Sequence, residues 1–193
     1  MIGQQKSEHK SEVRVAGIDA SLTGTGVCCL TKGVYYPVFL PEVKLRGAER
    51  LLELRRRLFK VIDDFKPELV MLEGYSYDSV GRLFEIGEWG GIIKVEMCSR
   101  GIPVESVAPK RLKRFMGVTR SDKELMLEAV KNRLKYDAGN NDNLADAAAL
   151  ARLAEVYLTN DTKYRSELEV VRDMRLVRTA QKNAKYTKRD GSL

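Results

Sequence analysis

Three acidic residues stand where their carboxylates could work together. Asp19 ends an apolar run just before a turn, Glu73 ends a second apolar run, and Asp146 lies near the start of an alanine-rich segment. A side chain at the end of a strand is held rigidly while its oxygens stay open, which suits a metal ligand. Carboxylates bind Mg²⁺ or Mn²⁺, and two such ions about 4 Å apart activate water and stabilise the leaving oxygen of a phosphodiester. The three acids therefore predict a two-metal site for phosphodiester hydrolysis.

Each acid also has a local explanation that needs no metal. Asp19 can be a turn residue at the mouth of a hairpin, Glu73 the polar end of a strand, and Asp146 a favourable charge near a helix N-terminus. The small hydroxyl and glycine residues of 21–26 would let a phosphate backbone approach Asp19. The metal-site interpretation depends on whether the fold brings the three carboxylates together.

The elements around these acids form an α/β pattern. Strands are expected at 13–19, 26–31, 34–40, 68–73 and 102–107, and helices at 47–65, 81–100, 121–136 and 143–158. Strands joined through a helix pair in parallel with a right-handed crossover, so the first strand should lie beside the fourth. We therefore expect a five-stranded mixed sheet, with three antiparallel and then two parallel strands, flanked by helices. Asp19 and Glu73 would then share one edge, and a closely packed alanine-rich helix would carry Asp146 to it.

Length and composition are consistent with one domain and an appendage. We expect a polar leader at 1–11, a nuclease domain at 12–158 and a basic C-terminal extension at 159–193. The opening residues are too polar for a secretory signal, and no run approaches the roughly 18 apolar residues of a membrane helix. The cysteines, Cys28 and Cys29 on opposite faces of one strand and Cys98 in a helix, are expected to be buried and reduced. These features favour a cytosolic protein.

Charge indicates an anionic partner. The chain has a formal net charge of +7, and its single histidine, His9, lies in the polar leader, which argues against histidine-based catalysis. The tail from 160 to 193 carries nine basic and five acidic residues and could contact DNA, pack as a further helix or simply be solvated. A denser group of six basic residues, predicted to bind nucleic acid, lies in 108–123: Lys110, Arg111, Lys113, Arg114, Arg120 and Lys123.

Four motifs in order resemble a known family. GIDASLTGTGV (17–27), LEGYSY (72–77), VAPKRLKRFMGVTRSDK (107–123) and NDNLADAAALA (141–151) are together similar to RuvC-type Holliday junction resolvases, particularly their divergent phage relatives, in the RNase H-like superfamily. The resemblance spans residues 13–158. It implies an RNase H-like fold, a homodimer, and paired metal-dependent nicking of four-way DNA junctions.

The resemblance also assigns roles to individual residues. Asp19, Glu73 and Asp146 take the positions of metal ligands, for Mg²⁺ or Mn²⁺ and two ions per site. Lys123, six residues beyond a glycine, resembles the family's basic residue near the scissile phosphate. Lys113 matches a second basic position of the family less closely, because its distance in sequence to that glycine differs by one residue from the family's spacing.

One position departs from the family pattern. The family usually has an acid three residues before the last aspartate, and here that position holds Asn143, with Asp142 one residue earlier. Asn143 can ligate through its amide oxygen, Asp142 can take its place, or the second metal can be held weakly. Asp142 is also well suited to be a helix N-cap. An inactivating change at Asn143 is the remaining interpretation.

Two further features have functional and structural interpretations. The loop after Glu73 contains Tyr75 and Tyr77, which by resemblance would stack on an unpaired junction base or would otherwise only pack. The helix at 81–100 has more apolar surface than one sheet contact requires, so it is the expected dimer seam, although core packing alone would explain most of this surface. Its apolar residues are Leu83, Phe84, Ile86, Trp89, Ile92, Ile93 and Val95.

Other functional classes remain open at this point. A module that binds branched DNA without cutting it would explain Asn143. A nuclease acting on flaps, other branched DNA or RNA would use the same acids. An actin-like nucleotide-binding domain shares the opening hairpin, but that fold needs two such domains and 193 residues are too few.

Overall fold

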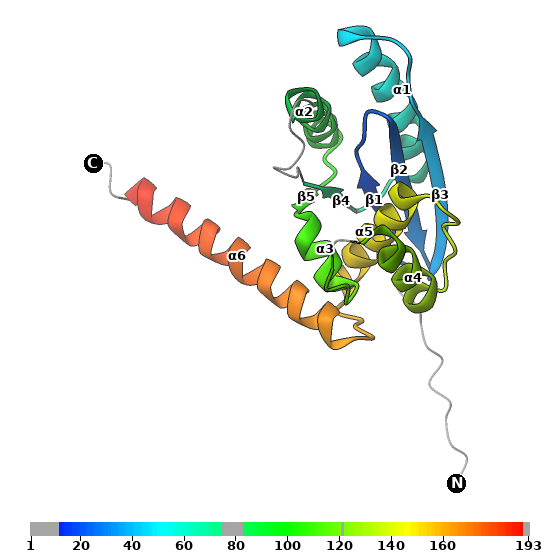
Figure 1. Ribbon diagram of the computed structural model, residues 1–193. Helices are drawn as coiled ribbons and strands as arrows, with labels where there is room; N and C mark the ends of the chain where they lie inside the picture. The colour runs from blue at the N-terminus through cyan, green and yellow to red at the C-terminus, as the bar shows by residue number, and fades with distance from the viewer. Residues whose placement is uncertain (1–11, 75–82, 121, 191–193) are drawn as a thin grey trace.

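The computed structural model describes residues 12–74, 83–120 and 122–190 (Figure 1). Its strands and helices follow one another in the order β1 (Val15–Asp19), β2 (Gly24–Thr31), β3 (Val34–Pro41), α1 (Gly47–Phe65), β4 (Leu69–Glu73), α2 (Leu83–Ser99), β5 (Val104–Val107), α3 (Pro109–Phe115), α4 (Lys123–Leu134), α5 (Asp142–Thr159) and α6 (Arg165–Asp190).

The strands form one five-stranded sheet in the order β3-β2-β1-β4-β5. The pairs β1–β2 and β2–β3 are antiparallel, whereas β1–β4 and β4–β5 are parallel. Ile18 is the register partner of Leu72, so Asp19 and Glu73 follow at the same edge of the sheet. The predicted fold class, strand order and strand directions are confirmed.

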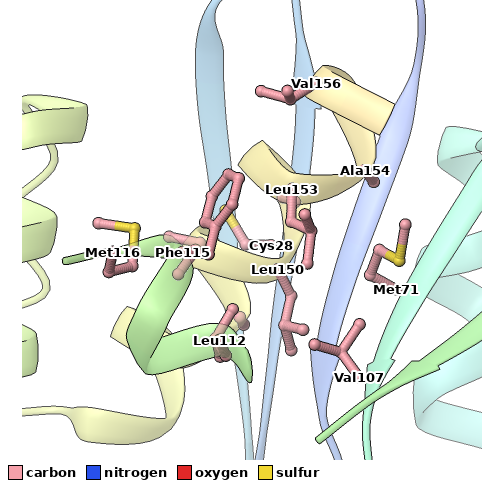
Figure 2. Packing of buried hydrophobic residues seen from close by; sticks show 14 of the residues in the cluster. Cys28, Met71, Val107, Leu112, Phe115, Met116, Leu150, Leu153, Ala154 and Val156 are labelled. Carbon is pink, nitrogen blue, oxygen red and sulfur yellow. The ribbon is translucent and has the colours of Figure 1, made fainter. Parts of the chain in front are cut away.

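Side chains alternate across the sheet and build a core on each face. Cys28 faces α3, α4 and α5, where Phe115 and Leu150 are fully buried, while Cys29 faces α1 and α2 on the other side. Figure 2 shows the first of these cores, in which α5 packs against the sheet. The molecule therefore has three layers, with α1 and α2 on one face and α5, flanked by α3 and α4, on the other. The predicted opposite orientation of the two cysteines is confirmed.

Helix α1 illustrates how sequence sets an element. Leu54, Leu58 and Ile62 recur at helical spacing and are buried, so one stripe of the helix faces the sheet. The helix stops at Phe65, since Pro67 disfavours the helical conformation in the residue before it.

Several expectations need correction. The segment at 109–115 forms a helix, α3, that is missing from the expected elements; Pro109 at its first turn is preorganised for the helical conformation. Helix α4 begins at Lys123, with Asp122 as its N-cap, rather than at the expected position 121. Cys98 is exposed, although burial was expected. No helix in the described ranges is long and apolar enough to span a membrane.

Candidate active site

The end of β1 and the end of β4 place two carboxylates side by side. Asp19 is the last residue of β1 and pairs with Gly26 of β2, while Glu73 is the last residue of β4 and pairs with Val107 of β5. Asp19 is only 8% exposed. Both side chains are thus held by strands that are paired on both sides.

Helix α5 brings the third carboxylate to them because glycines let it approach the sheet. A Cβ atom at Gly17 would lie 2.1 Å from the carbonyl oxygen of Ala147, and a Cβ at Gly26 would lie 2.1 Å from that of Asn143. Only glycine fits at such distances. The sequence predicted that a phosphate backbone could approach through the small residues of 21–26. At Gly26 this prediction is wrong, because α5 fills the space beside that glycine.

The three acids meet as the sequence predicted. One carboxylate oxygen from each of Asp19, Glu73 and Asp146 lies within 4.8 Å of the other two. Oxygens that share one Mg²⁺ at about 2.1 Å are at most roughly 4.2 Å apart, so a small adjustment of these side chains would hold the ion. The donor set is all oxygen, as a hard divalent cation prefers.

Burial and mutual repulsion make this cluster costly to ionise. The pKa of Asp19 is well above its usual value, first because of burial and then because of the charge of Glu73. Burial likewise raises the pKa of Glu73, and burial with the charges of Glu73 and Asp142 raises that of Asp146 to about 7. Crowded carboxylates that resist losing protons fit a site built to bind a cation.

Two lysines border the cluster. The charge of Lys113, on α3, offsets part of the rise that burial causes in the pKa of Glu73 and of Asp146. Lys123, the first residue of α4, forms an ion pair with Asp142, and its pKa is raised by this bond and by the nearby cluster. Lys123 remains 80% exposed. Both lysines that the sequence singled out therefore lie close enough to the acids to act on them electrostatically.

Asn143 has a defined partner. Its side-chain Nδ2 donates a 2.7 Å hydrogen bond to the carbonyl oxygen of Gly24, which ties the start of α5 to the start of β2. The N-cap of α5 is Asn141, whose side chain accepts from the amide of Leu144, so the N-cap interpretation of Asp142 is wrong. Asp142 instead holds Lys123.

The remaining predicted residues fall into three groups. Tyr75 and Tyr77 lie outside the described residues. Lys110, Arg114 and Arg120 are exposed, and Arg111 is half-buried. Arg114 forms an ion pair with Asp173 of α6.

Sequence reasoning missed two kinds of contributor to this site. The roles of Gly17 and Gly26 in the approach of α5 had one signal: glycines in the interior of strands mark close backbone contacts. The contact of Asp173 with α3 had none, because it joins residues far apart in the chain.

Comparison with known proteins agrees with this geometry. The family model described as crossover junction endodeoxyribonuclease RuvC matches residues 15–153. The RuvC of Hydrogenovibrio crunogenus is 26% identical over 153 residues, which cover 76% of this chain and 89% of that protein. The RuvC of Roseiflexus sp. is 31% identical over 147 residues, covering 72% and 88%.

Solved structures give the same result. Thermus thermophilus RuvC superimposes with a TM-score of 0.63 at 25% identity, covering 77% of this chain and 97% of that one. The same protein solved in complex with a Holliday junction substrate gives a TM-score of 0.61 at 25% identity, covering 72% and 90%. The yeast mitochondrial resolvase Ydc2 shares the fold, with a TM-score of 0.55 at 14% identity over 87% of this chain and 84% of its own. With a family model that spans most of its length, this chain belongs to the RuvC family of crossover junction endodeoxyribonucleases.

Proposed function

We propose that this chain resolves four-way DNA junctions by metal-dependent hydrolysis of phosphodiester bonds. The observation that carries the proposal is the convergence of Asp19, Glu73 and Asp146 within 4.8 Å, in a chain of the RuvC family. A relative of the same fold was solved in complex with a Holliday junction substrate, which supports the choice of substrate. A place in the phage branch of the family stays a prediction.

The chain's own residues have distinct parts in this proposal. Asp19, Glu73 and Asp146 would hold the metal, with Mg²⁺ or Mn²⁺ as the ion and two ions per site. Bound there, the metal would supply an activated water and a counter-charge for the leaving oxygen. Lys113 and Lys123 would bind the phosphate at the rim of the cluster, and Asp142 would keep Lys123 near it.

DNA would reach the site along α3. Lys110 and Arg114 are exposed on this helix and Arg120 follows it, so the three suit contacts with the sugar-phosphate backbone. Half-buried Arg111 is a fourth candidate. Stacking of Tyr75 or Tyr77 on a junction base also stays a prediction.

A homodimer is proposed because a four-way junction presents two equivalent strands. Phe84 and Val95 of α2 are 87% and 68% exposed, and Leu52 of α1 lies 62% exposed beside the groove that Val95 also lines. Exposed apolar side chains of this size favour an interface. The seam expected from the sequence must be narrowed, since Trp89 and Ile93 are fully buried in the core.

The cytosol is the proposed location. The three cysteines, two of them adjacent in β2, are free thiols, as a reducing compartment would keep them.

Cleavage of a synthetic four-way junction tests the function. We expect nicking with Mg²⁺ or Mn²⁺ by the native chain and loss of nicking in Asp146→Asn with junction binding retained. Asp64→Asn, which changes an exposed carboxylate on α1, is the matched control and should cleave normally. Binding without nicking by the native chain with either ion would favour the binding-only module, and faster cleavage of flaps or RNA would reassign the substrate.

A further inference from the structure

Helix α6 lies outside the segment that the family model matches, yet it is firmly attached to the domain. The match ends at residue 153, whereas α6 covers Arg165–Asp190. Val170 and Val171 are buried, and Glu167, 2% exposed, bonds to Arg152 of α5. The first half of the helix is thus part of the core.

The same half is fixed against the basic helix α3. Ser166 donates a 2.9 Å hydrogen bond to the carbonyl oxygen of Phe115, and Asp173 forms an ion pair with Arg114. Asp173 also has its pKa lowered, first by the bond to Arg114 and further by the charges of Arg172 and Arg111. The direction in which α6 leaves the domain is therefore set by α3.

Beyond these contacts α6 continues away from the sheet as a single helix (Figure 1). Arg178 of this helix pairs with Glu105 of β5 at 3.1 Å. The helix extends for twelve more residues, about 18 Å.

Charge is separated along α6. Residues 165–173 contain two basic and three acidic side chains, whereas residues 174–190 contain six basic and one acidic. Five of the basic residues follow one another at spacings of three, four, three and four, which places their positions on one face of a helix: Arg175, Arg178, Lys182, Lys185 and Arg189.

This pattern decides between classes of partner. Spacings of three and four with apolar residues would form a coiled-coil seam, but here those positions are basic and would repel a second copy. A row of positive charges on a projecting helix suits a polyanion. The helix that carries this row also contacts α3, whose Lys113 borders the three acids. Double-stranded DNA carries one charge per about 1.7 Å of its axis, so it can meet such a row along its whole length.

We propose that the distal half of α6 is an accessory DNA-binding element that contacts the backbone of one duplex arm of the bound junction. Arg175 and Arg178 anchor the helix through Tyr157, and Arg178 also through Glu105. The basic positions 182, 185 and 189 that follow on the same helical face are the ones that we propose for the DNA backbone. This inference rests on the proposed function for the identity of the DNA. It adds a surface that is separate from the active site.

The salt dependence of junction binding tests this element. The triple variant Lys182→Ala, Lys185→Ala, Arg189→Ala keeps good helix formers and removes three charges. Each phosphate contact contributes about 0.9 to the slope of log affinity against log salt, so the slope should fall in magnitude by roughly 2 to 3. Binding at 0.1 M salt should weaken at least tenfold. Measurements in EDTA exclude cleavage.

Control variants separate the possible outcomes. Gln181→Ala with Asn183→Ala changes the same stretch of α6 without changing charge, and its slope should stay native. Circular dichroism should show equal helix content in both variants. An unchanged slope in the triple variant, when the native chain binds the junction, overturns the role of α6. Failure of the native chain to bind junctions at all would instead count against the proposed function.

Discussion

Gly17→Ala should separate the sheet from the helix that carries Asp146. Gly17 lies in β1, two residues before Asp19, and directly beneath α5. An added Cβ would meet the carbonyl oxygen of Ala147 at 2.1 Å and the backbone nitrogen of Ala151 at 2.4 Å. These are backbone atoms, so no side-chain rotation can relieve the contact.

The size of the effect follows from these distances. Non-bonded atoms of this type normally stay more than 3 Å apart, so the strand and the helix must separate by about 1 Å. Overpacking of this kind typically costs about 1 to 3 kcal/mol in stability, and contact with backbone atoms that cannot rotate away places this case in the upper part of that range. Asp146 immediately precedes Ala147, so its carboxylate would shift relative to Asp19. A misplacement of about 1 Å in a catalytic constellation can reduce the rate roughly 100-fold.

Urea denaturation and junction cleavage measure the two effects separately. We expect Gly17→Ala to lose about 2 to 3 kcal/mol of unfolding free energy and roughly 100-fold in cleavage rate at temperatures where it is still folded. Gly87→Ala is the control for stability, because a Cβ there meets no atom within 4 Å and alanine favours the helix. Native stability and cleavage within twofold in Gly17→Ala would refute the close-approach argument.

Three further predictions concern charge and hydrogen bonding. In EDTA, the folded state holds the proton of Asp146 more tightly than the unfolded state, because its pKa is raised to about 7. The unfolding free energy should therefore fall by a few kcal/mol between about pH 4 and 7. Asp146→Asn should reduce this fall, Asp19 and Glu73 accounting for the remainder, and a flat native profile would contradict the prediction. Arg152→Met leaves Glu167 and Glu155 buried without their cation, so the unfolding free energy measured in urea should fall by about 3 to 5 kcal/mol. A fall of less than about 1 kcal/mol would show that this ion-pair network is dispensable for stability. Asn143→Asp loses the hydrogen bond to Gly24, so its unfolding free energy in EDTA should be about 1 kcal/mol lower than that of the native chain. Added Mn²⁺ should raise the unfolding free energy of Asn143→Asp more than that of Asn143→Ala. Equal increases in the two variants would exclude a metal contact at this position.

The sheet could be predicted because local and long-range signals agreed. Apolar strands ending in acids, together with the rule that strands joined through helices pair in parallel, were enough to place β1 beside β4. The alternation of Cys28 and Cys29 followed from strand geometry alone. By contrast, α3 is only seven residues long, and a short run of basic residues with one proline has no helical periodicity to detect.

The site was predictable in its residues but not in its contacts. Strand order brings Asp19 to Glu73, and the small side chains of α5 suggested that Asp146 could follow. The ion pair of Lys123 with Asp142 depends on the angle at which α4 meets α5, which no sequence pattern states. For the same reason the sequence offered an N-cap for Asp142, when the preceding residue is the cap.

Asn143 illustrates why a departure from a family pattern need not remove a site. Its amide nitrogen donates to the carbonyl oxygen of Gly24, and the amide oxygen takes no part in this hydrogen bond. An aspartate could not donate this bond, and it would add another negative charge beside Asp142 and the carboxylates whose pKa values burial already raises. An asparagine therefore holds α5 against β2 in the metal-free protein at lower electrostatic cost, while keeping one neutral oxygen as a candidate ligand. The expected consequence is a site that is better organised before metal binding and more weakly attractive to a second ion.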